Sequence, residues 1–448
     1  MAGRFYLPAV LVMVCVALSP AWPQSDDLHP LTLAEAVRIA LEKHPDIGKA
    51  RAGADALKGR IREVRAQALP EISILSTATR WRDPSLLNAS GLDNFPEELR
   101  EALVPSPVNL FDYSVSVKQP VYTAGKVGTA LRLASVEAEG SLAEIDRAQQ
   151  DVALDVVKAF YAVMWSGRYY ELVEATQQQR QLHLEMARTR LKNGVATEVD
   201  VLRSQVAVAN GMPELVRARN AIRQARSRLN YFLVRPLNHQ TAVSGAFEEK
   251  LWEQQDLEAL WKEAQRRRPE LQRLSIAQRS AAAQIDLARA ESRLRLDFAS
   301  TYGIMARMPE NLVNPQFARW TVGLNFTLPV FDGFRRSGLV WQATANERAA
   351  RLERQKMEQQ VRLALSQGLD DLAAARETVE ASRAAVNEAE RVLSMTQDNY
   401  KYGAATTLDI VDAQTAVSLA GTNLLRGLHD YSVARAELKW TMGLPPWE

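Results

Sequence analysis

A single cysteine, Cys15, occurs among the 448 residues of this chain. One thiol cannot form a disulfide within the chain, although an oxidising compartment would permit one. Val14 precedes it at the position where a lipoprotein signal has a small residue, so we expect no lipid anchor on this cysteine. Because Cys15 falls in a predicted signal peptide, the mature protein should contain no thiol.

An excess of charge of one sign is also missing. The chain has 55 basic and 53 acidic residues, interspersed along its length, and a formal net charge of +2. A basic surface of the kind that binds nucleic acid is therefore not expected.

Sequence motifs of enzymes and metalloproteins are absent. The five histidines are scattered with no pair at ligand spacing, at His29, His44, His183, His239 and His429. Zinc or copper would also lack cysteine ligands. No glycine-rich phosphate loop follows a strand, and neither a G-x-S-x-G elbow nor an H-E-x-x-H sequence occurs. We expect no cofactor, no intrinsic metal site and no catalysis.

The longest hydrophobic run lies at the amino terminus. It extends from Phe5 to Leu18, and Ser19 and Ala21 follow in the minus-three and minus-one positions of a cleavage site, which predicts a signal peptide over residues 1–21. A membrane anchor is the alternative, but the run is shorter than the roughly 20 residues of a spanning helix. No later stretch approaches roughly 18 apolar residues, so any membrane contact must use strands.

Proline is missing from residues 125–212 and 330–444, where Ala, Leu, Glu, Gln and Arg dominate. Large residues recur every seven positions at Leu365, Leu372, Val379, Val386, Leu393 and Tyr400. A small residue lies three positions after each of the first five, at Gly368, Ala375, Ser382, Ala389 and Thr396. A looser series runs through Val156, Val163, Tyr170, Gln177, Leu184 and Leu191. The pattern predicts long coiled-coil helices that approach closely, one of them about 95 Å long over residues 129–192.

Two copies of one phrase indicate an internal duplication. KNGVATEVDVLRSQ begins at Lys192 and KYGAATTLDIVDAQ begins at Lys401, and they share Lys, Gly, Ala, Thr, Asp and Gln at a constant offset. A fainter similarity upstream aligns Pro45 with Pro269. The chain is therefore predicted to be a tandem duplication of one unit.

Each copy of the phrase is predicted to form the tip of a helical hairpin. Residues suited to the left-handed conformation end the first helix: Asn193 and Gly194 in one copy, Gly403 in the other. A threonine can cap the next helix, with an aspartate in or near its first turn: Thr197 with Asp200, and Thr406 with Asp409. Pro213 interrupts the returning helix of the first repeat, where we expect a kink or a break.

Four windows of about ten residues alternate apolar and polar side chains, at residues 70–80, 111–122, 294–305 and 319–331. Their apolar positions are Ile72 and Ile74; Phe111, Tyr113, Val115 and Val117; Leu294, Leu296, Phe298, Tyr302 and Ile304; and Trp320, Val322, Leu324, Phe326 and Leu328. A half-buried strand of a soluble sheet would show the same alternation. The length and the terminal aromatic residues match tilted outer-membrane strands, with one face toward lipid and one toward a polar lumen.

The elements give the following organisation. The first repeat is predicted over residues 22–230, with helices in 32–69, strands at 70–80 and 111–122, and a coiled-coil hairpin over 125–230 whose tip is 193–197. A linker over 231–255 leads to the second repeat over 256–448, with helices in 256–293, strands at 294–305 and 319–331, and a hairpin over 333–442 whose tip is 402–406. The longer strand connection, 81–110, suits the cell exterior, where it could narrow the mouth of a channel.

Five segments in this order resemble the TolC-type outer-membrane efflux protein family over almost the whole mature length: LTLAEAVRIALEKHPDI, QPVYTAGKVGTALRLA, RLKNGVATEVDVLRSQ, LPVFDGFRRSG and NYKYGAATTLDIVDAQ. The resemblance implies a mainly α fold with a membrane β-barrel portion. It implies a homotrimer whose chains share a twelve-stranded barrel and build a periplasmic tunnel from their long helices. Four strands cannot close alone, because the smallest membrane barrels have eight; the number three comes from the resemblance.

The resemblance also assigns residues near the tips. Asp409 and Asp412 match aspartates that ring the tunnel constriction, and Tyr400 and Asp200 match a bonded pair that holds this end shut. The residues that match the adaptor-docking tips are Gly194, Val195, Thr197, Gly403, Ala404 and Thr406. Ala405 stands where some members have a basic gating residue. The sequence alone leaves open that the aspartates are helix amino-terminal charges stabilised by the helix dipole.

These observations favour a passive exit duct in the outer membrane of a Gram-negative-type cell. The implied partners are a periplasmic adaptor protein, an inner-membrane pump of the RND, ABC or MFS type, and outer-membrane lipid. A periplasmic coiled-coil adaptor or scaffold is the alternative, since the hairpins alone would suit it. The four alternating windows distinguish the two, because an adaptor needs no such strands. The transported substrate is not encoded in any recognisable feature.

Overall fold

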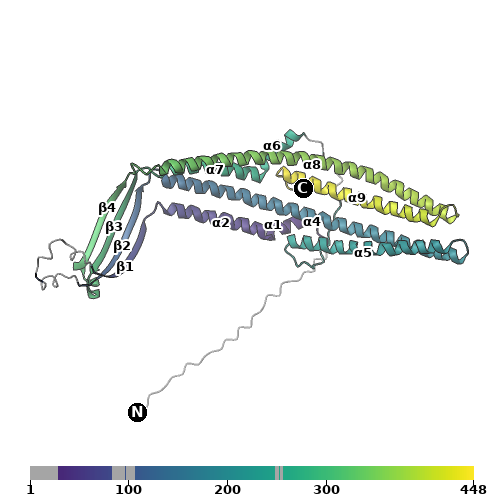
Figure 1. Cartoon of the computed structure of the whole chain (residues 1–448), viewed down its shortest axis with the longest axis horizontal. Coiled ribbons are helices and arrows are strands. Elements are labelled where there is room, and N and C mark those ends of the chain that lie inside the picture. Colours follow the sequence, from purple (N-terminus) through teal and green to yellow (C-terminus); the bar gives the residue numbers. More distant parts are fainter. Residues whose placement is uncertain (1–28, 83–95, 97–105, 248–251, 253–255, 448) are drawn as a thin grey trace, which may run out of the picture.

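The computed structural model describes residues 29–82, 96, 106–247, 252 and 256–447. A four-stranded sheet forms one end of an elongated molecule, and helices run from it to two hairpin tips at the opposite end (Figure 1). The predicted signal peptide, residues 1–21, and most of the 81–110 connection lie outside the described residues.

The helices occur in two series of equal lengths. The first series is α1 (Leu33–Lys43), α2 (Pro45–Ala66), α4 (Lys126–Lys192) and α5 (Glu198–Phe232). The second is α6 (Leu257–Arg267), α7 (Pro269–Ala290), α8 (Arg335–Lys401) and α9 (Thr407–Thr441). Both series have 11, 22, 67 and 35 residues in order. The predicted tandem duplication is confirmed.

Local sequence explains where the short helices begin. Thr32 and Glu35 form a reciprocal capping box at the start of α1, in which each side chain binds the other residue's backbone N–H. Pro45 and Pro269 occupy the first positions of α2 and α7, where a missing N–H costs no helical hydrogen bond. The chain therefore breaks before each proline and resumes as a new helix.

The helices pack side by side, and α4 contacts most of the others. Near the sheet, α4 packs against α2 and α7, and near the tips it packs against α5 and α9; α8 packs against α7 and α9. Leu365, Leu372, Leu393 and Tyr400 of the predicted seam are buried. A Cβ atom at Gly368 would lie 3.2 Å from Leu438 Cδ1, so the small residue does permit close packing of α8 and α9.

Of the kink or break expected at Pro213, the break is wrong, because α5 runs through this residue without interruption; the kink stays a prediction. The proline leaves a backbone carbonyl of the preceding turn without its helical partner. Gln177 of α4 donates its Nε2 to the Val208 carbonyl oxygen at 3.0 Å, and its side chain fills the space that a side chain at Gly211 would need. The carbonyl that loses its helical partner is that of Ala209, so this bond does not replace the lost one, but it ties the adjacent Val208 to α4.

The strands are β1 (Glu71–Trp81), β2 (Val108–Tyr122), β3 (Arg295–Ala306) and β4 (Ala318–Thr327), antiparallel in the order β1-β2-β3-β4. Two short 3₁₀ helices, Pro309–Val313 and Pro315–Phe317, connect β3 to β4. The last strand ends four residues before its predicted end at 331, and Pro329, which cannot donate to a ladder, follows it closely.

The register places the predicted apolar residues on one face of the sheet. Across the four strands, Ile74 lies opposite Val115, Val115 opposite Tyr302, and Tyr302 opposite Trp320. Trp320 is 71 % exposed in the single chain. Within the described residues, β1 and β4 each pair on one side only. The sheet therefore has two open edges and an uncovered apolar face.

The opposite face carries polar pairs. Ser73 and Ser116 hydroxyls lie 2.7 Å apart across β1 and β2. Arg319 of β4 pairs with Asp112 of β2, reaching across β3 beside Gly303. No helix in the described part of the chain is long and apolar enough to span a membrane.

We expect Gly303→Ala to impair folding of the sheet, because the added Cβ would overlap the Tyr113 carbonyl oxygen and the backbone of Ser114. Overpacking of this kind typically costs about 1–3 kcal/mol. The measurement is the thermal midpoint and yield of detergent-extracted protein. Gly323→Ala in β4 is the matched control, since its Cβ would have no neighbour within 4 Å; equal behaviour of the two variants would contradict this explanation.

Candidate functional site

The two hairpin tips share one backbone conformation. Gly194 and Gly403 adopt positive φ angles of 76° and 78° after the last residues of α4 and α8. The next N–H group in each tip donates back into the helix, from Val195 to the Arg190 carbonyl at 3.0 Å and from Ala404 to the Asn399 carbonyl at 2.8 Å. This is the Schellman arrangement, which favours glycine at the left-handed position.

The returning helices begin with matching capping boxes. Thr406 Oγ1 accepts the Asp409 N–H at 3.3 Å, while Asp409 Oδ2 accepts the Thr406 N–H at 2.7 Å. Thr197 and Asp200 repeat the arrangement at the start of α5. Hydrogen bonds from the backbone and hydroxyl of Thr406 lower the pKa of Asp409, and those of Thr197 lower the pKa of Asp200. The helix-terminal role that the sequence left open is therefore present, and it keeps both carboxylates ionised.

Asp412 lies three residues after Asp409 on α9, so the two carboxylates share one side of the helix. Both are exposed. Within the described residues, Asp412 has no hydrogen bond or ion pair. Its charge is available to a partner or an ion outside the single chain.

Tyr400 is buried, with 4 % of its surface exposed, although it lies one residue before the end of α8. Its hydroxyl is 3.4 Å from Thr407 Oγ1, and a hydrogen bond from Thr407 also lowers the pKa of Asp200. The structure thus brings Tyr400 and Asp200 to the same junction and joins them through Thr407. The sequence did not indicate that threonine.

Two residues of α4 that the sequence did not single out also contact Tyr400. The His183 ring lies 5.3 Å from the tyrosine ring, centroid to centroid. The Arg190 guanidinium lies 4.5 Å above the same ring and donates to the Tyr400 carbonyl at 2.6 Å. The two residues are seven apart and directly precede seam residues Leu184 and Leu191. In the sequence, the signal that could have identified them is that these polar residues recur every seven positions directly beside the seam.

His183 is an unusual part of this junction. It is 3 % exposed, and both ring nitrogens lack hydrogen-bond partners in the described part of the chain. Burial lowers the pKa of His183 below its ordinary value of 6.5, and the nearby Asp200 carboxylate opposes this only in part. The ring therefore packs as a neutral group.

A groove of about 380 Å³ lies between α5 and α9 close to the tips. Its lining is mostly apolar: Val199, Leu202, Arg203, Val206, Ala207, Asn210, Leu408 and Val411. Exposed Val195 lies in the adjoining loop. The tips thus offer apolar surface beside charged carboxylates.

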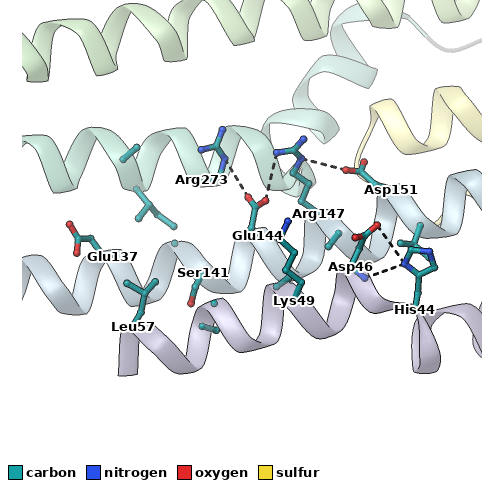
Figure 2. Close-up of a pocket in the computed structure, with 18 of the residues that line it drawn as sticks. His44, Asp46, Lys49, Leu57, Glu137, Ser141, Glu144, Arg147, Asp151 and Arg273 are labelled. Carbon is teal, nitrogen blue, oxygen red and sulfur yellow. Dashed lines mark hydrogen bonds and ion pairs between the residues drawn. The ribbon is translucent and has the colours of Figure 1, made fainter. Parts of the chain in front are cut away.

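A larger cavity of about 840 Å³ lies far from the tips, between α2, α4 and α7 (Figure 2). Arg147 points into its centre, with Nε 3.5 Å from Asp151 and 3.9 Å from Glu270. Asp151 accepts a hydrogen bond from Trp440 Nε1 of α9 at 3.1 Å, and burial raises the pKa of Asp151. These charges join three helices and are accounted for by that structural role. Among the described residues no group of three or more His, Cys, Asp or Glu side chains is placed to hold a metal ion.

The buried His183 predicts a pH dependence. Because its pKa is lower in the folded tip than in an unfolded chain, the unfolded state binds more protons below about pH 6.5 and stability falls as the pH decreases. His183→Phe keeps an apolar ring and should flatten the dependence of the thermal midpoint between about pH 7.5 and 5. His429→Phe, at a half-buried histidine outside the tip, is the control. A slope unchanged in His183→Phe would contradict the assignment.

Known proteins resemble this chain over nearly its whole length. A family model described as "Outer membrane efflux protein" matches residues 36–233 and 260–444. Protein CyaE of Bordetella pertussis is 24 % identical over 372 residues, which cover 81 % of this chain and 73 % of that protein. Outer membrane protein TolC of Escherichia coli is 22 % identical over 429 residues, covering 92 % and 82 %.

A solved structure, the CmeC outer membrane channel of Campylobacter jejuni, shares the fold. It superposes with a TM-score of 0.78 at 14 % identity and covers 92 % of this chain and 85 % of the other. The family model spans most of both repeats and includes the tips and the strands. The chain belongs to the outer membrane efflux protein family.

Proposed function

We propose that this chain is one subunit of a homotrimeric exit duct, through which substrates leave the cell for a tripartite efflux or type I secretion system. Family membership supports the outer-membrane location and the channel role. The observation that carries the proposal is the sheet, which has an apolar face and two open edges at β1 and β4. In lipid such edges must be paired, so the sheet can function only when several chains close a barrel.

The alternative, a periplasmic adaptor or scaffold, would explain the helical hairpins but not the sheet. A water-exposed sheet with this apolar face would expose Val322, Leu324 and Phe326, which are each more than half accessible. Patches of that kind indicate contact with another protein or with lipid. The strand lengths of 10 to 15 residues suit a crossing of the bilayer.

The tips are the proposed contact site for a periplasmic adaptor. The exposed residues proposed to dock are Gly194, Val195, Thr197, Gly403, Ala404 and Thr406. The apolar groove between α5 and α9 adjoins them and would add buried area. An inner-membrane pump of the RND, ABC or MFS type would supply energy through this adaptor.

Lipid contact can be tested with one residue from each face of β4. We expect Val322→Lys to lower the yield of folded oligomer from the outer membrane, because a lysine facing lipid near the midplane costs about 2–4 kcal/mol. Thr321→Lys points to the opposite face and should assemble normally. The measurement is extraction with detergent, oligomer size and ion conductance in planar bilayers. Recovery of wild-type protein as a soluble periplasmic monomer would refute the duct.

The aspartates of α9 are proposed to form a charged ring at the periplasmic constriction. Three copies of Asp409 and Asp412 around one axis would attract cations. We expect Asp409→Asn with Asp412→Asn to weaken block by a trivalent cation about tenfold, since each chain loses two charges. Asparagine is chosen because it retains a side-chain oxygen for the helix cap.

The control for this experiment is Asp398→Asn, an exposed aspartate near the same tip that pairs with Lys401 at 2.9 Å. Its removal should leave block unchanged. Equal block in the double variant and the wild type would place the constriction elsewhere.

A further inference from the structure

At the junction between the two hairpins, the side chain of Arg190 reaches from α4 to the end of α8. Arg190 contacts Tyr400 in two ways, through a hydrogen bond of 2.6 Å to its carbonyl oxygen and through the guanidinium 4.5 Å above its ring. His183 packs against the same ring from one heptad earlier. Tyr400 therefore lies against two side chains of the neighbouring hairpin at nearly complete burial.

The position of this carbonyl makes the contact favourable. Tyr400 lies in the last turn of α8, where the helix dipole is negative, and its carbonyl oxygen accepts the Gly403 N–H at 3.2 Å in addition to Arg190. A guanidinium can donate to that carbonyl while its plane lies on an aromatic ring. A lysine could supply the charge but not both contacts.

The duplicated sequence supplies an internal comparison. Aligning Gly194 with Gly403 places Asn399 at the Arg190 position and Leu191 at the Tyr400 position. The two tips share a backbone conformation, yet only one pairing of helices has the arginine and tyrosine. The contact is therefore a property of these side chains and is not required by the fold of a hairpin.

We propose that Arg190 is a positioning residue for the closed tip, holding the end of α8 against α4 within each chain. It acts through Tyr400, and Ala405 supplies no charge at this tip. Arg190 acts within one chain, and other contacts would hold neighbouring chains together at the tips. Opening by a partner requires the guanidinium to leave both the carbonyl and the ring. The inference rests on the proposed duct, because closure has meaning only for a channel.

The test is the ratio of open to closed time of the purified trimer in planar bilayers. Arg190→Ala should raise this ratio about tenfold, equivalent to about 1.4 kcal/mol. Arg190→Lys should give an intermediate increase, since it keeps the charge and loses the stacking. Arg188→Ala removes an exposed arginine of the same helix turn, paired with Glu185 at 2.8 Å, and should behave as wild type.

A distance measurement separates failure of this inference from failure of the duct. Since the predicted mature chain is free of cysteine, spin labels at Val195→Cys and Ala404→Cys report the separation of the two tips in detergent. Labelled chains are diluted with unlabelled ones so that the distance within a chain dominates. Arg190→Ala should lengthen and broaden this distance.

The outcomes are distinct. Absence of conductance in the wild type and all variants would refute the duct, whereas the tip distance would still test the contact. An unchanged distance and an unchanged open-to-closed ratio in Arg190→Ala, with intact oligomer and thermal midpoint, would overturn the role of Arg190. If the alanine variant does not assemble, Arg190→Lys decides, because wild-type gating in that variant would also overturn it.

Discussion

Unpaired backbone groups at the edges of a sheet are the constraint on which the architecture depends. In the bilayer no water satisfies an exposed N–H or carbonyl, and each would cost several kcal/mol. In the described part of the chain, the sheet ends at β1 and β4 with both edges open. These outer strands run antiparallel to each other in the sheet, so β4 of one chain can pair with β1 of the next in the same sense as the pairs within a chain. Closure by identical chains follows from this geometry together with the family fold.

Because the corresponding helices of the two repeats have equal lengths, both hairpin tips lie at the same distance from the sheet. Each 67-residue helix spans about 100 Å at 1.5 Å per residue. A difference in length between α4 and α8 would displace one tip relative to the other by about 1.5 Å per residue and shift Tyr400 relative to Arg190. Small residues at the seam, such as Gly368 against Leu438, keep the long helices close enough for this precision. The junction at the tips thus depends on packing distributed along the whole tunnel wall.

The sequence was sufficient to predict the features that repeat over a few residues. It was not sufficient to predict contacts between segments that are far apart in the chain. Alternation in the strands and heptads in the helices were sufficient for element types and for the apolar face, because each arises from neighbouring residues. They were not sufficient to predict that α5 continues through Pro213, where Gln177 of another helix contacts the preceding turn. Likewise Arg190 and His183 became recognisable only when α4 and α8 were placed side by side. Tyr400 and Asp200 were assigned by resemblance, but the intervening Thr407 required coordinates.

The tip couples folding and electrostatics in the same carboxylates. Asp200 and Asp409 accept hydrogen bonds from the backbone N–H and hydroxyl groups of the capping residues Thr197 and Thr406, which lowers their pKa values and fixes the start of α5 and α9. A residue without a side-chain acceptor at either position would remove the charge and weaken the cap together. Asp412 has no such structural role in the described chain, and its exposure leaves its charge to act outside the subunit. Of the two aspartates of α9, Asp409 therefore both caps the helix and carries a charge, whereas Asp412 carries a charge alone.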